Sequence, residues 1–224
     1  MKKVKDFYYK KAKEENYKAR SVFKLEEAQN KFKFIKFSDR VLDIGCSPGS
    51  FSQYMLNKIL KSGFVVGVDI IPNSFSHQRF TFILGDIKEM NLKTFNNIEF
   101  DVVISDAMTN TTSDKETNHF RSIALAKSIF SLTKEVLKNE GNFFIKVFDG
   151  KDLSDFKNEI KKYFKSVEIF KPKSSRDESR EIFLIAKYFN KSIDTKWFFI
   201  YNIFNLNKRI NYEKRIRIGF RNLW

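Results

Sequence analysis

Cysteine, histidine, proline and glycine are all scarce in this sequence of 224 residues. The single cysteine, Cys46, excludes an intramolecular disulfide, which agrees with a protein of the reducing cytoplasm. The two histidines, His77 and His119, stand alone and predict no metal site. The basic N-terminus lacks the apolar segment of a secretory signal. The longest apolar run, around residues 197–201, is far shorter than the ~20 residues that span a bilayer, so we expect no membrane partner.

Basic residues, by contrast, are plentiful, and they gather at the two ends of the chain. The net charge is +15. Residues 1–36 hold 12 basic against 5 acidic side chains and residues 191–224 hold 8 against 2, whereas residues 37–190 hold 22 against 20. A nearly neutral core with basic ends is typical of a protein that binds a polyanion such as RNA. A solvated surface that only keeps the protein in solution is the alternative.

Residues 40–54 have the pattern of a strand, a glycine turn and the start of a helix. Gly45 and Gly49 would let the main chain come close to a ligand, and the helix that starts near Phe51 would offer free N–H groups. The turn lacks the glycine spacing of a dinucleotide site and the lysine of a P-loop. Asp43, at the end of the strand, would repel a phosphate. A cationic, hydroxyl-rich ligand such as S-adenosylmethionine fits this cradle, and a plain strand–turn–helix joint is the alternative.

Three further acidic residues stand at the ends of expected strands. Asp69 ends a second strand about 20 residues after the turn, where a carboxylate can bind ribose hydroxyls. Asp86 ends a third strand, where it could bind an adenine amino group, cap the next helix, or do both. Asp106 ends a fourth strand. Because ligands bind at the carboxyl ends of the strands in open α/β sheets, Asp106 is a candidate catalytic residue.

Two charged residues belong to the last strands of the core. Lys146 interrupts an otherwise apolar fifth strand, and a buried lysine is costly unless it is paired. The alternative is a lysine whose ammonium group reaches solvent. A basic loop over residues 171–180 would suit a phosphate backbone, and it leads into a last strand that starts at Glu181. If that strand is antiparallel to its neighbours, Glu181 shares an edge with Asp106 and Lys146.

The remaining segments frame this core. Residues 19–33 have helical spacing, and Lys24, which lies off the buried face, looks like an ordinary surface lysine. Residues 1–17 form a basic arm or frayed helix whose tyrosines suit base stacking, although a solvated terminus fits nearly as well. Residues 190–224 are a basic, aromatic extension. We expect one domain over the whole chain, with its core at about 18–189.

Together these stretches resemble the FtsJ/RrmJ-type 2′-O-ribose RNA methyltransferases. The matching segments follow the order of that family and cover roughly residues 17–188; they are 18–25, 43–54, 105–110, 144–150 and 171–186. The resemblance implies an α/β fold, the Rossmann-like fold of class I S-adenosylmethionine-dependent methyltransferases. Its sheet would have seven strands, mostly parallel with an antiparallel last strand, and helices would cover both faces.

The resemblance also implies the site. A catalytic Lys-Asp-Lys-Glu tetrad falls on four positions: Lys24, Asp106, Lys146 and Glu181. Of these, Lys24 becomes a candidate through the resemblance alone. The contacts to S-adenosylmethionine fall on six positions: Gly45, Gly49, Phe51, Asp69, Asp86 and Asp106. The chain departs from the family where Ser50-Phe51 replaces the common Gly-Trp and Thr109 replaces a proline, which predicts a less rigid loop after Asp106.

The implied reaction is methyl transfer to a ribose 2′-hydroxyl, which needs in-line alignment and removal of the hydroxyl proton. We expect Lys146 to accept the proton with the help of Lys24, Glu181 to position Lys146 and the hydroxyl, and Asp106 to lie near the sulfonium. The expected substrate is a uridine of large-subunit (23S) ribosomal RNA, modified by a monomeric enzyme. A tRNA or cap methyltransferase and a non-catalytic RNA-binding or ribosome assembly factor are the alternatives.

Overall fold

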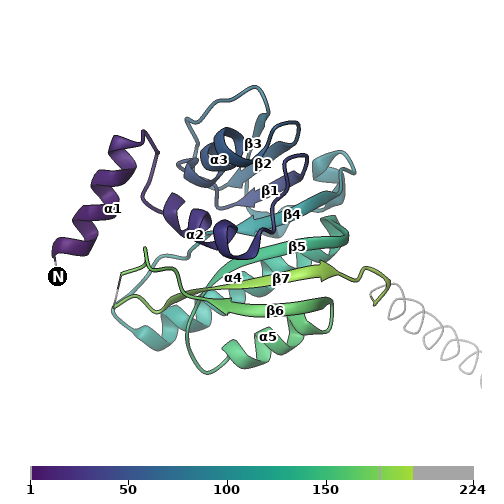
Figure 1. Cartoon of the computed structure of the whole chain (residues 1–224). Helices are drawn as coiled ribbons and strands as arrows, with labels where there is room; N and C mark the ends of the chain where they lie inside the picture. Colours follow the sequence, from purple (N-terminus) through teal and green to yellow (C-terminus); the bar gives the residue numbers. More distant parts are fainter. Residues whose placement is uncertain (1, 177, 194–224) are drawn as a thin grey trace, which may run out of the picture. The chain divides into compact units, whose positions relative to one another are not determined.

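The computed structural model describes residues 2–176 and 178–193 (Figure 1). The chain divides into two units, Met1–Phe189 and Asn190–Trp224, and all the elements named below belong to the first. Of the second unit only residues 190–193 are described. The basic, aromatic extension therefore lies almost wholly outside the described residues, and a single domain over the whole chain stays a prediction.

A seven-stranded sheet forms the centre of the first unit, in the order β3-β2-β1-β4-β5-β7-β6. The strands are β1 (Arg40–Ile44), β2 (Phe64–Asp69), β3 (Phe80–Leu84), β4 (Phe100–Ser105), β5 (Leu137–Phe148), β6 (Phe164–Phe170) and β7 (Glu181–Phe189). Strands β1 to β5 run parallel, and β7 runs antiparallel to both β5 and β6. The predicted mostly parallel sheet with an antiparallel last strand is confirmed.

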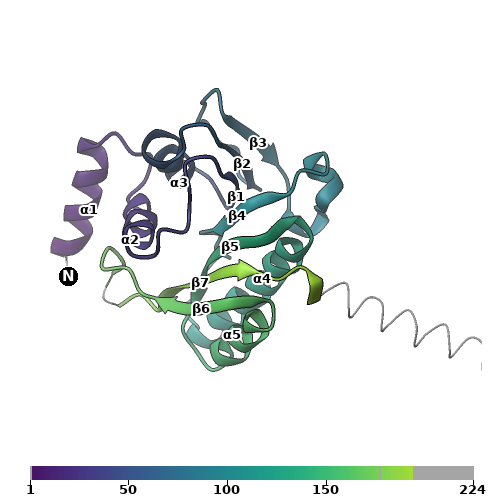
Figure 2. The same cartoon turned by 45° about the vertical axis from the view of Figure 1, so that its right-hand side comes forward.

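Helices cover both faces of this sheet, as predicted (Figures 1 and 2). The helices α4 (Lys115–Val136) and α5 (Leu153–Lys161) pack on one face, and α2 (Val22–Phe32) and α3 (Ser50–Tyr54) on the other. Because side chains alternate along a strand, Phe143 and Ile145 of β5 pack toward α4 while Phe144 packs toward α2. Lys146 is in phase with Phe144, so its side chain lies on the α2 face.

The N-terminal arm and the shorter helical segments take more specific forms than expected. The arm contains a regular helix, α1 (Lys2–Glu14). The helix after the cradle is α3, which continues as a π-helical turn, η1 (Met55–Ile59). Where one short helix was expected, there are two 3₁₀ turns, η2 (Ile87–Glu89) and η3 (Leu92–Phe95). No helix among the described residues is long and apolar enough to cross a membrane.

The helical spacing after residue 118 predicts a long helix to about Lys138, ended by the segment 139–141, and the structure places the end of that helix two residues earlier. Helix α4 ends at Val136 and β5 begins at the next residue, Leu137. Leu137 pairs with Phe100 of β4, and the Lys138 ammonium forms an ion pair with Asp101. Cross-strand pairing therefore draws these residues into the sheet, against their helical spacing. The segment 139–141 is an irregularity within the strand, with a positive φ of 62° at Glu140, and not a helix end.

Phenylalanine rings fill the core on the α4 face, and Phe130 of α4 is at their centre. Its side chain is fully buried. Its ring contacts four others at centroid distances of 5.6 to 6.4 Å; they belong to Phe143, Phe156, Tyr163 and Phe164. Aromatic pairs at such distances stabilise a core beyond the area they bury. The many phenylalanines of this part of the chain thus serve packing.

Replacing Phe130 by alanine should lower the free energy of unfolding by about 3–5 kcal/mol, because it opens a cavity under four rings. Phe120 lies on the same helix and is 62% exposed, so Phe120→Ala is the matched control. That control should change the free energy by less than about 0.5 kcal/mol. Urea denaturation followed by circular dichroism measures both values. Equal losses for the two variants would contradict this account of the core.

Candidate active site

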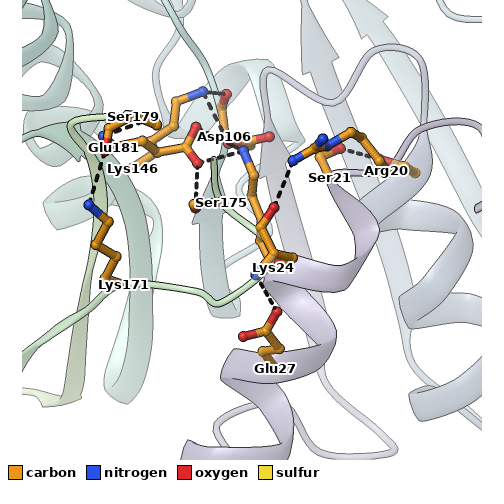
Figure 3. A network of polar contacts seen from close by, with 12 residues as sticks. Arg20, Ser21, Lys24, Glu27, Asp106, Lys146, Lys171, Ser175, Ser179 and Glu181 are labelled. Atoms are coloured by element: carbon orange, nitrogen blue, oxygen red, sulfur yellow. Dashed lines mark hydrogen bonds and ion pairs between the residues drawn. The ribbon is translucent and has the colours of Figure 1, made fainter. Parts of the chain in front are cut away.

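Four charged side chains meet at the carboxyl ends of the central strands (Figure 3). Lys24 comes from α2, Asp106 directly follows β4, Lys146 lies near the end of β5, and Glu181 is the first residue of β7. Strand alternation explains why they converge. Val102 and Ile104 precede Asp106 on the α2 face, as Phe144 precedes Lys146 and Phe183 follows Glu181. The structure brings all four members of the expected tetrad together.

Three ion pairs link the four groups. The Lys146 ammonium donates to the main-chain oxygen of Asp106 at 2.6 Å and lies 3.0 Å from Asp106 Oδ1. The Lys24 ammonium lies 2.8 and 2.7 Å from the two carboxylate oxygens of Glu181 and 4.0 Å from Asp106 Oδ1. Lys146 and Glu181 are each 8% exposed. Two positive and two negative charges balance, which makes their burial tolerable.

The partners of Glu181 differ from the expectation. The β5–β7 register places Lys146 opposite Phe183, and Glu181 opposite Phe148. The carboxylate of Glu181 therefore faces Lys24, and it also accepts a hydrogen bond from Ser175 Oγ at 2.9 Å. A direct Glu181–Lys146 contact is not among the hydrogen bonds and ion pairs of the described residues. The structure thus gives each lysine its own carboxylate, with Asp106 between the two ammonium groups.

The loop before β7 is tied to α2, which sequence reasoning missed. Glu27 accepts main-chain N–H bonds from Lys173 at 2.7 Å and from Ser174 at 2.9 Å. The Arg20 guanidinium donates to the main-chain oxygen of Ser174 at 2.7 Å. These bonds hold Ser175 where its hydroxyl reaches Glu181. The one signal in the sequence is spacing, since Glu27 follows Lys24 by three residues and so lies on a neighbouring part of the helix surface.

A cavity of about 460 Å³ opens beside the tetrad. Its lining includes Lys24 and Glu181, two cationic side chains, Arg20 and Arg176, and two apolar ones, Met108 and Phe148. Helix α4 holds Phe148 by its main chain. The Phe148 N–H donates to Ser122 Oγ at 3.0 Å, and the Phe148 oxygen accepts from His119 Nδ1 at 2.9 Å. The cavity thus combines fixed apolar walls with charges that suit a nucleotide.

The glycine cradle is held in a conformation that depends on its glycines. Gly45 has φ 75° and Gly49 has φ 104°. A Cβ on Gly45 would lie 2.5 Å from Ala107 Cα, and one on Gly49 would lie 2.6 Å from Phe75 Cβ. The turn is therefore packed against the segment after β4 and the loop after β2. Both glycines occupy the positions at which the sequence predicts a close approach of the main chain.

The other residues expected to bind the cofactor lie around this turn. Asp69 accepts the Ser47 and Ile71 N–H groups, each at 2.9 Å, so its carboxylate braces the cradle. Asp86 accepts the Lys88 N–H at 3.0 Å at the start of η2, which confirms its capping role.

The two residues that depart from the family pattern at the start of α3 have separate contacts. Phe51 is 3% exposed and packs in the core on the α2 face. Ser50 is hydrogen-bonded through its hydroxyl to Ser21 Oγ at 2.8 Å, which joins the cradle to the turn before α2.

Comparison with known proteins agrees with this geometry. The model of the family described as FtsJ-like methyltransferase matches residues 17–189. The chain belongs to the FtsJ-like methyltransferase family. It is 81% identical over 191 residues to the ribosomal RNA large subunit methyltransferase E of Brachyspira hyodysenteriae, covering 85% of this chain and 99% of that one. It is 40% identical to the protein of the same name from Bdellovibrio bacteriovorus, covering 81% and 95%.

A solved structure shows the same fold. A crystal structure described as a ribosomal RNA methyltransferase of Plasmodium falciparum superposes with a TM-score of 0.68 at 29% identity, covering 77% of this chain and 98% of that one. The class I methyltransferase fold is thus established for this FtsJ-like methyltransferase. Residues before 17 and after 189 fall outside the family match.

Enzymes of this family use S-adenosylmethionine, and the cradle of this chain fits that cofactor. Asp43 is 1% exposed; its Oδ2 accepts from Ser52 Oγ at 2.7 Å, and its Oδ1 has no partner among the described residues. Burial, with the nearby charges of Asp106 and Asp69, raises the pKa of Asp43 to about 7. A site so rich in carboxylates suits a sulfonium cation and repels phosphate. Asp69, Asp86 and Asp106 are the carboxylates predicted to hold the cofactor, which would supply an activated methyl group.

Asp43→Asn should change how stability depends on pH. Because the pKa of Asp43 is higher in the folded protein, the folded state binds more protons, and this stabilisation is lost as the pH rises from about 4 to about 7. We define the difference as the free energy of unfolding of the wild type minus that of Asp43→Asn. Within that window this difference should fall by up to about 1.4 kcal/mol per pH unit. Urea denaturation at several pH values measures it.

Asp114→Asn is the control for that experiment. Asp114 caps α4, and its hydrogen bonds from Thr117 hold the pKa of this exposed carboxyl below its ordinary value. Its contribution is therefore fully present above about pH 4 and is lost only as the pH falls below that value, so the corresponding difference should stay nearly constant between pH 4 and 8. If the free energies of unfolding of the wild type and Asp43→Asn differed by a constant amount between pH 4 and 8, the raised pKa of Asp43 would be refuted.

Proposed function

We propose that this chain methylates the 2′-hydroxyl of a uridine in large-subunit ribosomal RNA, with S-adenosylmethionine as the methyl donor. The tetrad carries the proposal. Two lysines and two carboxylates, paired and largely buried, meet at the carboxyl ends of the central strands, and two of them, Lys24 and Glu181, line a cavity of about 460 Å³. A protein that only bound RNA would not need a lysine in a central strand. The names of the relatives at 81% and 40% identity support the ribosomal substrate.

In this proposal Lys146 takes the proton of the ribose hydroxyl. The cofactor would supply an activated methyl group whose sulfur leaves as a neutral thioether. The neutral amine of Lys146, after releasing its own proton to solvent, would accept the O–H proton as the 2′-oxygen is methylated. Asp106 orients Lys146 through the 2.6 Å bond to its main-chain oxygen and the 3.0 Å contact to its carboxylate. Lys24, held by Glu181, presents a second cation to the reacting oxygen. Alignment and proton removal are the two requirements of this displacement.

The cavity and the charge of the protein support an RNA substrate. Arg20 and Arg176 line the cavity and can contact phosphates, while Met108 and Phe148 can contact a base. The tetrad would read a ribose and not a base, so it is equally suited to tRNA or to a cap, and the relatives' names favour ribosomal RNA. All four tetrad residues come from one chain, so a monomer suffices. A ribosomal RNA substrate supports the expected cytoplasmic location.

Lys146→Ala should slow methyl transfer by roughly 10²–10⁴-fold, the usual effect of removing a general base, while binding of S-adenosylmethionine persists. Lys138→Ala is the control, because Lys138 lies in the same strand but pairs with Asp101 away from the tetrad. Transfer of a radioactive methyl group to large ribosomal subunits, to naked large-subunit RNA and to bulk tRNA measures the rates. A Lys146→Ala protein with a near wild-type rate would rule out the mechanism.

The labelled nucleoside decides the substrate in the same experiment. Label in 2′-O-methyluridine of large-subunit RNA is the expected result, and comparison of subunits with naked RNA shows which form is recognised. Label in tRNA alone would keep the chemistry and overturn the proposed substrate. A protein that binds the cofactor but labels no RNA would overturn the enzymatic proposal in favour of an RNA-binding factor.

Ser175→Ala should lower kcat about tenfold, since the hydroxyl supplies one hydrogen bond to the charged Glu181. Cofactor affinity should not change. Ser174→Ala is the matched control, because the neighbouring Ser174 Oγ is buried without a partner among the described residues. Steady-state kinetics separates kcat from KM for both variants. An equal loss in the two would mean that the loop matters only for stability and does not position Glu181.

A further inference from the structure

A second hollow, which we call the α1–α2 groove, lies on the other side of the loop that holds Glu181. It has a volume of about 600 Å³ and is lined by α1, α2, the end of β6 and the start of the following loop. Its lining includes six residues with side chains that suit a nucleotide: Tyr8, Lys11, Lys31, Ile169, Lys171 and Lys173. The tetrad and the cofactor cradle make no use of this groove.

The α1–α2 groove and the tetrad cavity share two walls. Lys173 lines the groove and Arg176 lines the cavity, and both belong to the loop that Glu27 ties to α2. On α2 itself, Lys24 faces the cavity and Lys31 faces the groove. Seven residues of helix span about 10 Å, which is about the length of three stacked nucleotides at ~3.4 Å each. An RNA strand that leaves the tetrad cavity would therefore reach the α1–α2 groove within a few nucleotides.

Arg20 belongs to the tetrad cavity, which its side chain lines. Burial and the charge of Arg176 lower the pKa of Arg20, while Glu181 and Tyr8 act in the opposite direction. Arg20 thus interacts with a member of the tetrad and with a residue of the groove. Burial and the charge of Glu27 raise the pKa of Tyr8, and the charge of Arg20 acts in the opposite direction.

The charges and rings of the groove fit single-stranded RNA. Four lysines face two acidic residues, Glu26 and Glu27, which leaves a net charge of +2. Glu27 accepts two main-chain N–H bonds, which turn its carboxylate toward the loop before β7. The partly exposed Tyr8 ring and the 45% exposed Ile169 offer apolar surface. Single-stranded nucleic acid is bound by this combination of cations with aromatic stacking.

We propose that the α1–α2 groove binds the single-stranded RNA that adjoins the methylated ribose, with a base stacked on Tyr8 and phosphates on Lys31 and Lys173. This inference rests on the proposed function, because it takes RNA as the substrate. The groove would determine how RNA is held, and the tetrad would determine what happens to it.

Replacing two lysines of the groove should weaken RNA binding and should make the binding constant depend less steeply on salt concentration. The probe is a fluorescein-labelled oligouridylate of 12 nucleotides, and the measurement is anisotropy between 50 and 300 mM salt. Lys31→Gln with Lys173→Gln should weaken binding about tenfold and lower the salt slope by about 1.4, at ~0.7 for each lost phosphate contact. The matched control replaces two exposed lysines at the end of α5, Lys161→Gln with Lys162→Gln, and should leave the slope unchanged.

Tyr8 tests the stacking contact separately. Tyr8→Ala should weaken binding at least fivefold, whereas Tyr8→Phe, which keeps the ring, should bind as the wild type does. In the methylation assay the groove variants should raise KM for large-subunit RNA and leave kcat at saturating RNA and cofactor affinity unchanged. Thermal unfolding shows that each variant is folded.

The outcomes separate this proposal from the proposed function. If the wild type methylates RNA but the groove and α5 variants share one salt slope and one KM, the groove proposal alone is overturned. If the wild type binds oligouridylate through the groove yet methylates no RNA, the groove stands and the enzymatic proposal fails. A groove variant that changes sedimentation of the protein, and not RNA binding, would show that a second copy of the chain occupies the groove and would overturn the proposal.

Discussion

The pairing of Lys146 with Asp106 is the interaction on which the rest of this structure depends. A lysine in a central strand loses its water, and only a close carboxylate and a main-chain oxygen make that position tolerable. The parallel β4–β5 register supplies both partners from one residue. Asp106 then lies beside a second cation, Lys24, which requires a second carboxylate, Glu181. Charge balance therefore links α2, β4, β5 and the antiparallel β7 into one site.

Helix α2 contributes a residue to the tetrad and also holds the loop before β7. Its Lys24 completes the tetrad, and its Glu27 captures two N–H groups of the loop before β7. Ser175 of that loop in turn binds Glu181. The position of Glu181 in the tetrad and the wall of the α1–α2 groove thus both depend on the hydrogen bonds that Glu27 and Ser175 make. A change that loosened the Glu27 contacts would reach both hollows, which is why single-residue tests within the loop need a neighbouring control.

The distribution of charge separates the two ligands. Carboxylates surround the cradle, where burial raises the pKa of Asp43 to about 7 and disfavours any further anion. Lysines and arginines line the tetrad cavity and the groove beyond it. On the proposed function, a cationic cofactor and an anionic RNA would be drawn to different sides of the tetrad.

The acids and glycines at the strand ends, the lysine in the apolar pattern of β5 and the family could all be predicted from the amino-acid sequence, because these depend on local spacing and residue type. Lys24 needed the resemblance to the family, since a lysine off a helix's buried face has no local signal. The folded structure was needed to show that Leu137 and Lys138 join β5, that Glu181 pairs with Lys24, and that Glu27 and Ser175 support the site. Those contacts join segments more than 30 residues apart in nearly every case, and their energies depend on which groups the packed sheet and helices bring within reach.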